Sequence, residues 1–369
     1  MSELVNDNES FSLKKSQMEA EGLDPVLVNK GFDSLKEEFP AIYSLLVIKN
    51  GKLVFEKYNT GIYPFYKNIY SGLKKAQYRG MGKIFRFSDL SFRDVYDGKW
   101  NIRSVTKCVL SLLAGVAVDK GYIPSLDNRV IGYFPEYESQ AAREKNNIRI
   151  RHLLSMKSGL ESIEKRAMSI SMIKSSDWIK FILNLNFEST PGEKFSFNTA
   201  DSHLLSGVLS RASGMSTLEL AQKYLFKPLN INSVYWENDP KGFHFGGSNL
   251  FMLPVDLAKI GLLVLNGGMA GNNRIISAEW INESMSKASI AEDGYSYGYC
   301  WRIGNIKSEK TGRNYQAYSG SGAGGQRLYI IPSLDIVMVT VGRLTFGFDR
   351  SFSIERFMEK YLLPSAEEK

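Results

Sequence analysis

Ser104 and Lys107 stand three positions apart at the start of a long apolar stretch. On a helix this spacing places both side chains on one face, within reach of each other. A serine hydroxyl is a weak nucleophile at neutral pH, and a lysine amine can take its proton only where burial lowers the pKa of the amine. The start of a helix also stabilises the negative charge that develops when a carbonyl group is attacked. The pair therefore indicates catalysis by a serine that a lysine activates.

The apolar stretch helps to decide between this catalytic interpretation and a simpler alternative. After Lys107 the residues are almost all small and apolar as far as Val118, enough for about three helical turns. A helix that is apolar on every side is expected to be buried. The simpler alternative is a capping serine followed by a solvated lysine. Burial of this helix favours the catalytic interpretation.

Further blocks follow the Ser-x-x-Lys sequence at 121–130, 133–136 and 148–160. In this order the blocks resemble the serine β-lactamase and penicillin-binding-protein superfamily, most closely its class C-like branch with esterases, D-aminopeptidases and 6-aminohexanoate-dimer hydrolases. The resemblance covers residues 40 to 360 or so. It implies an α/β protein of the β-lactamase/transpeptidase-like fold, in which helices flank an antiparallel sheet and a mostly helical lobe carries the Ser-x-x-Lys helix.

The second motif of this family normally reads Tyr-x-Asn, and its tyrosine hydroxyl shuttles a proton beside the serine and lysine. Here Phe197 takes the place of the tyrosine and Thr199 that of the asparagine. Phenylalanine has no ionisable group and cannot act as a base. Three interpretations remain open: a natural variant in which Lys107 acts alone or with another donor, an engineered Tyr-to-Phe substitution that traps a complex, or a binding protein without turnover. Asp201 and His203 could suggest a substitute pair, but His203 is interpreted as a satisfied helix residue.

The third motif is a Lys/His-Thr-Gly strand edge that ends shortly before a Gly-Gly pair. Counting back from the Gly-Gly pair at 324–325 gives Ser319-Gly320-Ser321, and allowing one inserted residue gives Tyr318-Ser319-Gly320. Either match lacks the positive or imidazole group, which counts against a β-lactam or D-Ala-D-Ala carboxylate as the natural ligand. Glycines would let this edge approach the substrate, and its amide at Ser321 or Gly322 would form an oxyanion hole with that of Ser104.

Composition and charge narrow the possible partners. The net charge of +7 is spread along the sequence, which disfavours nucleic-acid binding. Cys108 and Cys300 cannot build a disulfide framework, and no metal-type spacing occurs. The first residues show no signal peptide and no window reaches transmembrane length without charges, so we expect a cytoplasmic protein without a membrane partner. No metal or organic cofactor is required.

The elements that must position these residues divide the chain into segments. We expect a flexible tail at 1–22, an α/β lobe from 23–100 and 256–369, and a mostly helical lobe at 101–255. In the α/β lobe the pattern predicts a helix at 24–39, a hairpin of strands 42–49 and 53–58 around Asn50-Gly51, strands at 297–303, 315–318, 327–331 and 336–341, and a final helix at 351–362. A helix is also predicted at 162–185. The insertion at 61–100 is either a basic, aromatic lid over the serine or a surface insertion or oligomer contact.

The leading hypothesis is a serine hydrolase that acts on a small-molecule amide or ester through an acyl-enzyme on Ser104. Lys107 would be its base, Thr199 and the strand edge would bind substrate, and Phe197 and Tyr318 would line the pocket. The alternatives are an acyltransferase in small-molecule biosynthesis and a catalytically impaired binding protein.

Overall fold

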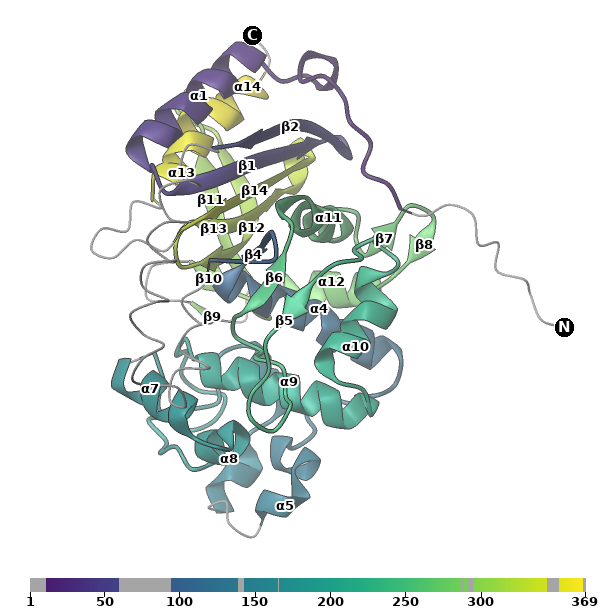
Figure 1. The fold of residues 1–369 in the computed structure, drawn as a ribbon, viewed down its shortest axis with the longest axis vertical. Helices are drawn as coiled ribbons and strands as arrows, with labels where there is room; N and C mark the ends of the chain where they lie inside the picture. The colour runs from purple at the N-terminus through teal and green to yellow at the C-terminus, as the bar shows by residue number, and fades with distance from the viewer. Residues whose placement is uncertain are drawn as a thin grey trace, which may run out of the picture.

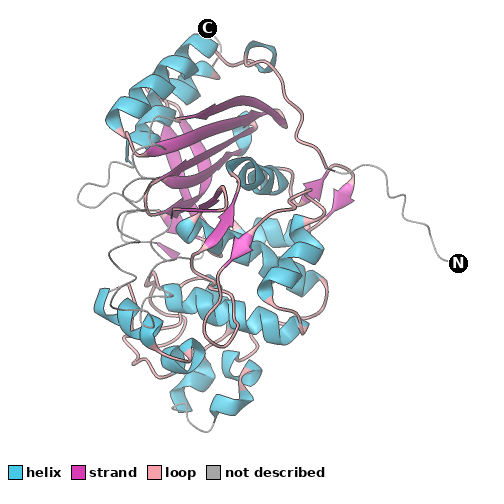
Figure 2. Cartoon of the chain, in the orientation of Figure 1, coloured by secondary structure: helices cyan, strands magenta, loops and turns pink. Residues whose placement is uncertain are grey.

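The computed structural model describes residues 11–59, 94–138, 143–164, 166–286, 289–290, 295–343 and 352–367. Within them, eight strands form one antiparallel sheet. These strands are β1 (Ile42–Lys49), β2 (Lys52–Tyr58), β9 (Ser289–Ile290), β10 (Ser296–Tyr297), β11 (Arg302–Lys307), β12 (Asn314–Gly322), β13 (Gln326–Ile331) and β14 (Ile336–Gly342). Their order is β2-β1-β14-β13-β12-β11-β10-β9. The sheet lies above a mostly helical part of the molecule (Figures 1 and 2).

Both faces of this sheet are covered, so β1 and β14 are largely apolar on both faces. Along β1, Leu45 and Val47 belong to the core on one face, whereas Leu46 and Ile48 belong to the core on the other. Successive side chains of a strand point to opposite faces, and a strand with two buried faces loses the usual alternation of apolar and polar residues. This accounts for the continuous apolar runs from which the strands were predicted.

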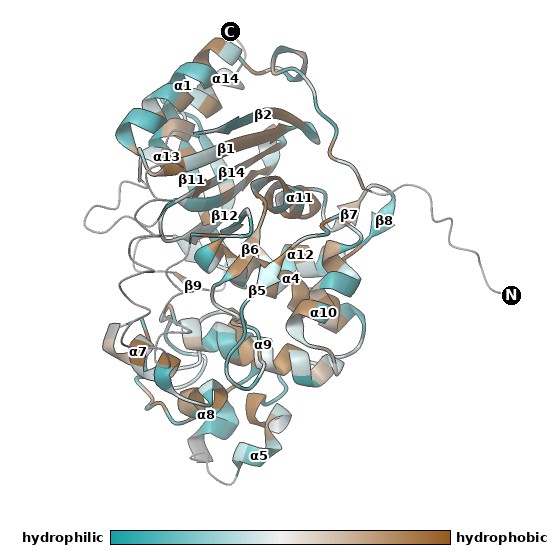
Figure 3. Ribbon diagram, viewed as in Figure 1, coloured by the Kyte–Doolittle hydropathy of each residue, from teal (hydrophilic) through white to brown (hydrophobic). Residues whose placement is uncertain are grey.

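Helices cover the two faces of the sheet in different ways. The N-terminal and C-terminal helices pack on one face: α1 (Pro25–Glu38), α13 (Phe352–Phe357), a π-helical turn (Met358–Leu362) and α14 (Leu363–Ser365). On the other face lie α11 (Pro254–Leu265) and α4 (Thr106–Asp119), both strongly apolar (Figure 3). Helix α4 thereby separates the sheet from the helical lobe (Figure 1) and is buried as predicted.

The helical lobe and the connections around it contain shorter elements. Its helices are α5 (Pro135–Glu138), α6 (Ile150–Leu154), α7 (Arg166–Lys174), α8 (Trp178–Leu183), α9 (Thr199–Ser213) and α10 (Thr217–Ala221), and α12 (Ala278–Ser284) packs against α4. Single turns occur at Glu19–Glu21, Arg103–Val105, Val130–Tyr133, Arg143–Asn147, Gln222–Phe226 and Pro332–Leu334. Short strands form a second sheet from β3 (Val95–Tyr96), β4 (Lys99–Asn101), β6 (Leu250–Met252) and β5 (Tyr235–Trp236), and a separate hairpin of β7 (Met269–Ala270) and β8 (Asn273–Arg274).

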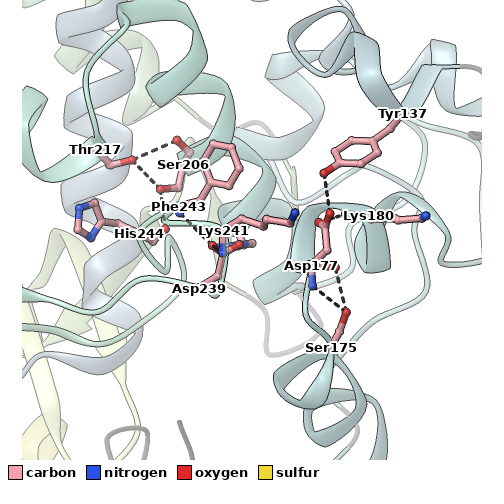
Figure 4. A network of polar contacts seen from close by, with 11 residues as sticks. Tyr137, Ser175, Asp177, Lys180, Ser206, Thr217, Asp239, Lys241, Phe243 and His244 are labelled. Carbon is pink, nitrogen blue, oxygen red and sulfur yellow. Dashed lines mark hydrogen bonds and ion pairs between the residues drawn. The ribbon is translucent and has the colours of Figure 1, made fainter. Parts of the chain in front are cut away.

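The helix predicted at 162–185 is wrong in its continuity, because the chain forms α7 and α8 with a break between them. The Asp177 carboxylate accepts a hydrogen bond from the Lys180 amide (2.9 Å) and so caps the start of α8. Its other carboxylate oxygen accepts one from the Tyr137 hydroxyl (2.6 Å), and Ser175 bonds the Asp177 backbone (Figure 4). These contacts end one helix and begin the next.

The strand predicted at 297–303 is also interrupted, and β10 and β11 flank a turn at 298–301. Cys300 has a φ of 63°, in the left-handed region, and the Gly298 amide donates to the Trp301 carbonyl (2.8 Å). A Cβ on Gly298 would lie 2.2 Å from the Ser284 carbonyl oxygen, so only glycine fits this approach. By contrast, the predicted Asn50-Gly51 turn joins β1 to β2, with a positive φ at both residues.

The structure describes part of the predicted N-terminal tail and part of the predicted insertion at 61–100. Residues 11–22 of the predicted loose tail pack along the sheet: Leu53 donates its amide to the Lys14 carbonyl (2.8 Å), and Ser16 donates its amide to the Leu53 carbonyl (3.1 Å). Of the predicted lid, residues 60–93 lie outside the described part of the chain, and residues 94–100 contribute to β3 and β4. None of the described helices has the length and apolar character required to cross a membrane.

Candidate active site

Ser104 is held at the start of the buried helix by the residues that precede it. It lies in the 3-10 turn Arg103–Val105, which leads directly into α4. Arg103 adopts a φ of 52°, an uncommon conformation for a residue with a side chain. The Asn101 side chain accepts a hydrogen bond from the Arg103 amide (2.9 Å), and the Arg103 guanidinium pairs with Asp94 (2.9 Å). These contacts fix the backbone immediately before the hydroxyl.

The Lys107 side chain is buried, with 1% of its surface exposed, and its amine lies beside Ser104. Its Nζ is 3.3 Å from Ser104 Oγ, 3.1 Å from Thr199 Oγ1 and 2.9 Å from the carbonyl oxygen of Gly247. Burial lowers the pKa of Lys107, because the charged form is poorly solvated there, and the nearby Glu164 carboxylate offsets part of that effect. The structure thus brings together three residues singled out in the sequence, Ser104, Lys107 and Thr199.

Two residues around Lys107 were missed by the sequence analysis, Glu164 and Gly247. A Cβ on Gly247 would lie 2.3 Å from Thr199 Cγ2 and 3.3 Å from Lys107 Nζ, so its lack of a side chain makes room for the amine. The Gly246-Gly247 pair was a signal that could have suggested such a close approach. Glu164 accepts a hydrogen bond from the Thr199 amide (2.7 Å) at the start of α9, and no motif in the sequence marks it.

Phe197 lies beside Lys107, next to the candidate nucleophile. Lys107 Nζ is 4.7 Å from the centre of the Phe197 ring, and the side chain is partly open to solvent, with 37% exposed. The ring can interact with the amine through its π face but cannot exchange a proton with it. The site therefore has an aromatic wall at this point and no hydroxyl.

The strand edge of the third motif passes close to the turn that carries Ser104. A Cβ on Gly320 would lie 2.7 Å from Cys108 Sγ and 3.1 Å from Val105 Cγ1, and one on Gly322 would lie 2.9 Å from Arg103 Cβ. Pairing of β12 with β11 ends at Ser319, so residues 320–322 pair only with β13. The glycines therefore let an unpaired edge of the sheet approach the serine.

The side chains of this strand divide between two faces. Because successive residues alternate, Tyr318 shares the face of Gly320 and Gly322, toward the helical lobe, whereas Ser319 and Ser321 take the opposite face. Ser319 is almost completely buried there. Of the candidate substrate-binding residues, Ser319 and Ser321 thus offer only their backbone to the site.

Asp201 and His203 lie on α9 but belong to the core. His203 is fully buried, with Nε2 3.1 Å from the Asp239 carboxylate and its ring against Trp178. Asp201 is also fully buried and faces Ser158, whose amide donates a long hydrogen bond (3.4 Å). Neither side chain contacts Ser104 or Lys107 in the described structure. Burial raises the pKa of Asp201 to about 8, with only partial compensation from Ser158.

Asp201→Asn should make the free energy of unfolding less dependent on pH between pH 5 and pH 8. Asp201 stays protonated in the folded protein up to about pH 8, whereas in the unfolded chain it ionises near pH 4. The unfolded state therefore binds fewer protons in this window, and the free energy of unfolding falls as pH rises, by up to about 1.4 kcal/mol per pH unit. Chemical denaturation at pH 5 and pH 8 should show a smaller fall for the variant. Equal falls in both proteins would contradict the assignment.

No group of three or more His, Cys, Asp or Glu side chains among the described residues is arranged to hold a metal ion. The two cysteines are free and buried. Cys108, which follows Lys107 in the sequence, donates a hydrogen bond from its Sγ to the Cys300 carbonyl (3.2 Å). Burial raises the pKa of the Cys108 thiol, so the thiol behaves as a small core group.

Comparisons with known proteins place this geometry among related ones. The beta-lactamase family model matches residues 40–350. The chain is 23% identical over 262 residues to the 6-aminohexanoate-dimer hydrolase of Paenarthrobacter ureafaciens, covering 66% of each protein. It is 22% identical over 309 residues to beta-lactamase-like protein 2 of Dictyostelium discoideum, covering 73% of this chain and 53% of the relative. The chain thus spans just under two thirds of the first relative and about half of the second.

A solved structure agrees with the fold. A family VIII carboxylesterase has a TM-score of 0.64 to this chain at 18% identity, covering 91% of this chain and 97% of the other. At this identity the likeness shows the fold alone. Two of the three proteins compared are, by name, hydrolases.

Proposed function

Since the chain belongs to the beta-lactamase family, we propose that it is a serine hydrolase that cleaves an amide or an ester through an acyl-enzyme on Ser104. The observation that carries the proposal is the position of the buried Lys107 amine, 3.3 Å from the Ser104 hydroxyl. A serine with a desolvated amine at this distance has the base that it requires to become a nucleophile. The amide- and ester-cleaving relatives favour these two substrate classes.

The hydrogen bonds of Lys107 support its role as that base. A neutral amine has two N–H donors and one lone pair. The Gly247 carbonyl can only accept a hydrogen bond, and the Thr199 hydroxyl is placed to accept a second. These two acceptors take both N–H groups and leave the lone pair for the Ser104 proton. Desolvation favours the neutral amine, so Lys107 is prepared to accept that proton when Ser104 attacks.

The backbone supplies the group that would stabilise the attacked carbonyl. Ser104 lies at the N-terminal end of the turn and helix through residue 119, where the helix dipole favours negative charge. The edge of β12 at 320–322 stands beside that turn. We expect the amides of Ser104 and of Ser321 or Gly322 to bind the developing oxyanion.

Active-site titration tests this function. A fluorophosphonate probe should label the protein once per chain, and labelling should stop hydrolysis of short p-nitrophenyl esters and p-nitroanilides. A protein that binds such compounds but neither labels nor releases product would instead be the impaired binding protein. Addition of amine or alcohol acceptors separates hydrolysis from the acyltransferase alternative, since only a transferase forms product in proportion to the acceptor.

Phe197→Tyr should raise turnover of a short amide or ester by at least about tenfold, the low side of one general-base contribution. The phenol would add an oxygen near Lys107, whose Nζ already lies 4.7 Å from the ring centre. It could direct water onto the acyl-enzyme, which should accumulate less than in the unsubstituted protein. Stopped-flow measurements give the turnover rate, and intact-mass measurements give the accumulation of the acyl-enzyme. Phe195→Tyr, whose ring packs against Tyr297, is the matched control. No gain for Phe197→Tyr would show that protons take another route.

A further inference from the structure

A short segment of the helical lobe is tied to the second motif along its whole length. Residues 160–164 run beside residues 197–199, and hydrogen bonds join them at successive positions. These are Ser162 Oγ to the Phe197 carbonyl (3.1 Å), the Ile163 amide to Asn198 Oδ1 (3.3 Å), Asn198 Nδ2 to the Leu160 (3.3 Å) and Glu161 (3.2 Å) carbonyls, and the Thr199 amide to Glu164 Oε1 (2.7 Å). The Glu164 carboxylate is therefore fixed at the point where Phe197 and Thr199 enter the site.

Glu164 also lies within electrostatic reach of the proposed base. The residue that donates its amide to Glu164 is Thr199, and the hydroxyl of Thr199 accepts the hydrogen bond from Lys107 Nζ (3.1 Å). The charge of Glu164 offsets part of the lowering of the Lys107 pKa that burial causes. Its side chain is exposed, so water can reach it. Thr199 thus links a water-accessible carboxylate to Lys107, at the point of the site where Phe197 stands in place of the family's tyrosine.

We propose that Glu164 performs in this chain the proton transfer for which Phe197 has no group, and that it activates the water that hydrolyses the acyl-enzyme. The proposal deepens the serine-hydrolase function and rests on it. As the water oxygen bonds to the acyl carbon, its proton passes to the Glu164 carboxylate. The bond between the acyl carbon and Ser104 Oγ then breaks, and Oγ takes a proton from Lys107. Glu164 passes the proton that it took from water to Lys107. The products are the free acid and the unmodified serine, with Glu164 and Lys107 in their starting states.

The geometry also allows a lesser role, in which Glu164 only caps α9 through the Thr199 amide. The two roles predict different behaviour when the missing hydroxyl is restored. A proton-transfer role becomes partly redundant in Phe197→Tyr, because the phenol offers a second route, whereas a capping role is needed equally in both backgrounds. Glu164→Gln suits the comparison, since its amide oxygen can still accept from Thr199 while it cannot take a proton.

The experiment follows the decay of the acyl-enzyme formed with a short p-nitrophenyl ester, by intact mass after rapid mixing. Glu164→Gln should slow decay by about 100-fold with Phe197 present, a typical general-base contribution, but by less than about tenfold in the Phe197→Tyr background. Formation of the acyl-enzyme should change much less than its decay. Glu161→Gln is the control: Glu161 lines a separate cavity with Lys180 and Phe181, and decay should stay within about twofold.

The outcomes separate this inference from the function on which it rests. An adduct on Ser104 that decays equally fast in Glu164→Gln would overturn the inference and leave the hydrolase intact. Equal slowing in the Phe197 and Phe197→Tyr backgrounds would overturn it in favour of capping. Failure of every protein, including the unsubstituted one, to form an adduct would overturn both. Thermal melting shows whether each variant is folded. If Glu164→Gln alone is not folded, the double variant Glu164→Gln with Phe197→Tyr gives the answer, because recovery of its decay rate requires a folded site.

Discussion

Ser104→Ala should abolish labelling by serine-directed probes and lower ester and amide turnover by about 10,000-fold or more. The reason is that Ser104 combines a position at the start of a buried helix with a desolvated amine 3.3 Å from its hydroxyl. The only side-chain hydrogen bond of Ser104 within the described structure is the one to Lys107. Loss of the hydroxyl should therefore leave the thermal midpoint almost unchanged.

Probe labelling and thermal melting of the same preparation check this prediction together. An alanine variant that melts normally and fails to label identifies Ser104 as the nucleophile. Continued labelling of the alanine variant, at the rate of the unsubstituted protein, would place the nucleophile elsewhere and remove the basis of the proposed mechanism.

Lys107→Ala should slow acylation of Ser104 by about 100- to 10,000-fold, the usual contribution of a general base. The substitution removes the amine that faces Ser104, and it also leaves the Gly247 carbonyl without its buried donor (2.9 Å). A loss of stability is therefore expected as well, and the rate must be compared at a temperature where both proteins are folded. Single-turnover release of p-nitrophenol measures acylation directly.

Lys120→Ala is the matched control for this experiment, because Lys120 stands at the other end of the same helix, where it approaches the ring of Tyr224. Its acylation rate should equal that of the unsubstituted protein. A drop of less than about tenfold in Lys107→Ala would mean that another group activates Ser104.

The sequence predicted the elements whose signal is local and continuous. The apolar run after Lys107 identified α4 and its burial, and Asn50-Gly51 identified the β1–β2 hairpin. The resemblance and the fold class that it implied are confirmed by the family match over residues 40–350 and by the likeness to solved structures. These features depend on residues close together in the sequence or on a motif order that spans the chain.

The features that the sequence did not predict depend on contacts between distant residues or on single polar side chains. The Gly247 carbonyl bonds Lys107 across 140 positions, and no motif in the sequence indicates that Glu164 accepts a hydrogen bond from the Thr199 amide. The helix predicted at 162–185 is too long, because Asp177 caps a new helix by accepting a hydrogen bond from the Lys180 amide. The left-handed backbone of Arg103 has no glycine to signal it, and the Asn101 side chain that holds it is fixed by tertiary structure.

Trapping the acyl-enzyme identifies the residue that carries the acyl group. The protein is mixed with a short p-nitrophenyl ester, quenched in acid within the first turnover, digested, and sequenced by tandem mass spectrometry. We expect one acyl group per chain, carried by Ser104, that is present in the unsubstituted protein and absent from Ser104→Ala. Product release with no acyl group on any peptide, or with the acyl group on a residue other than Ser104, would contradict it.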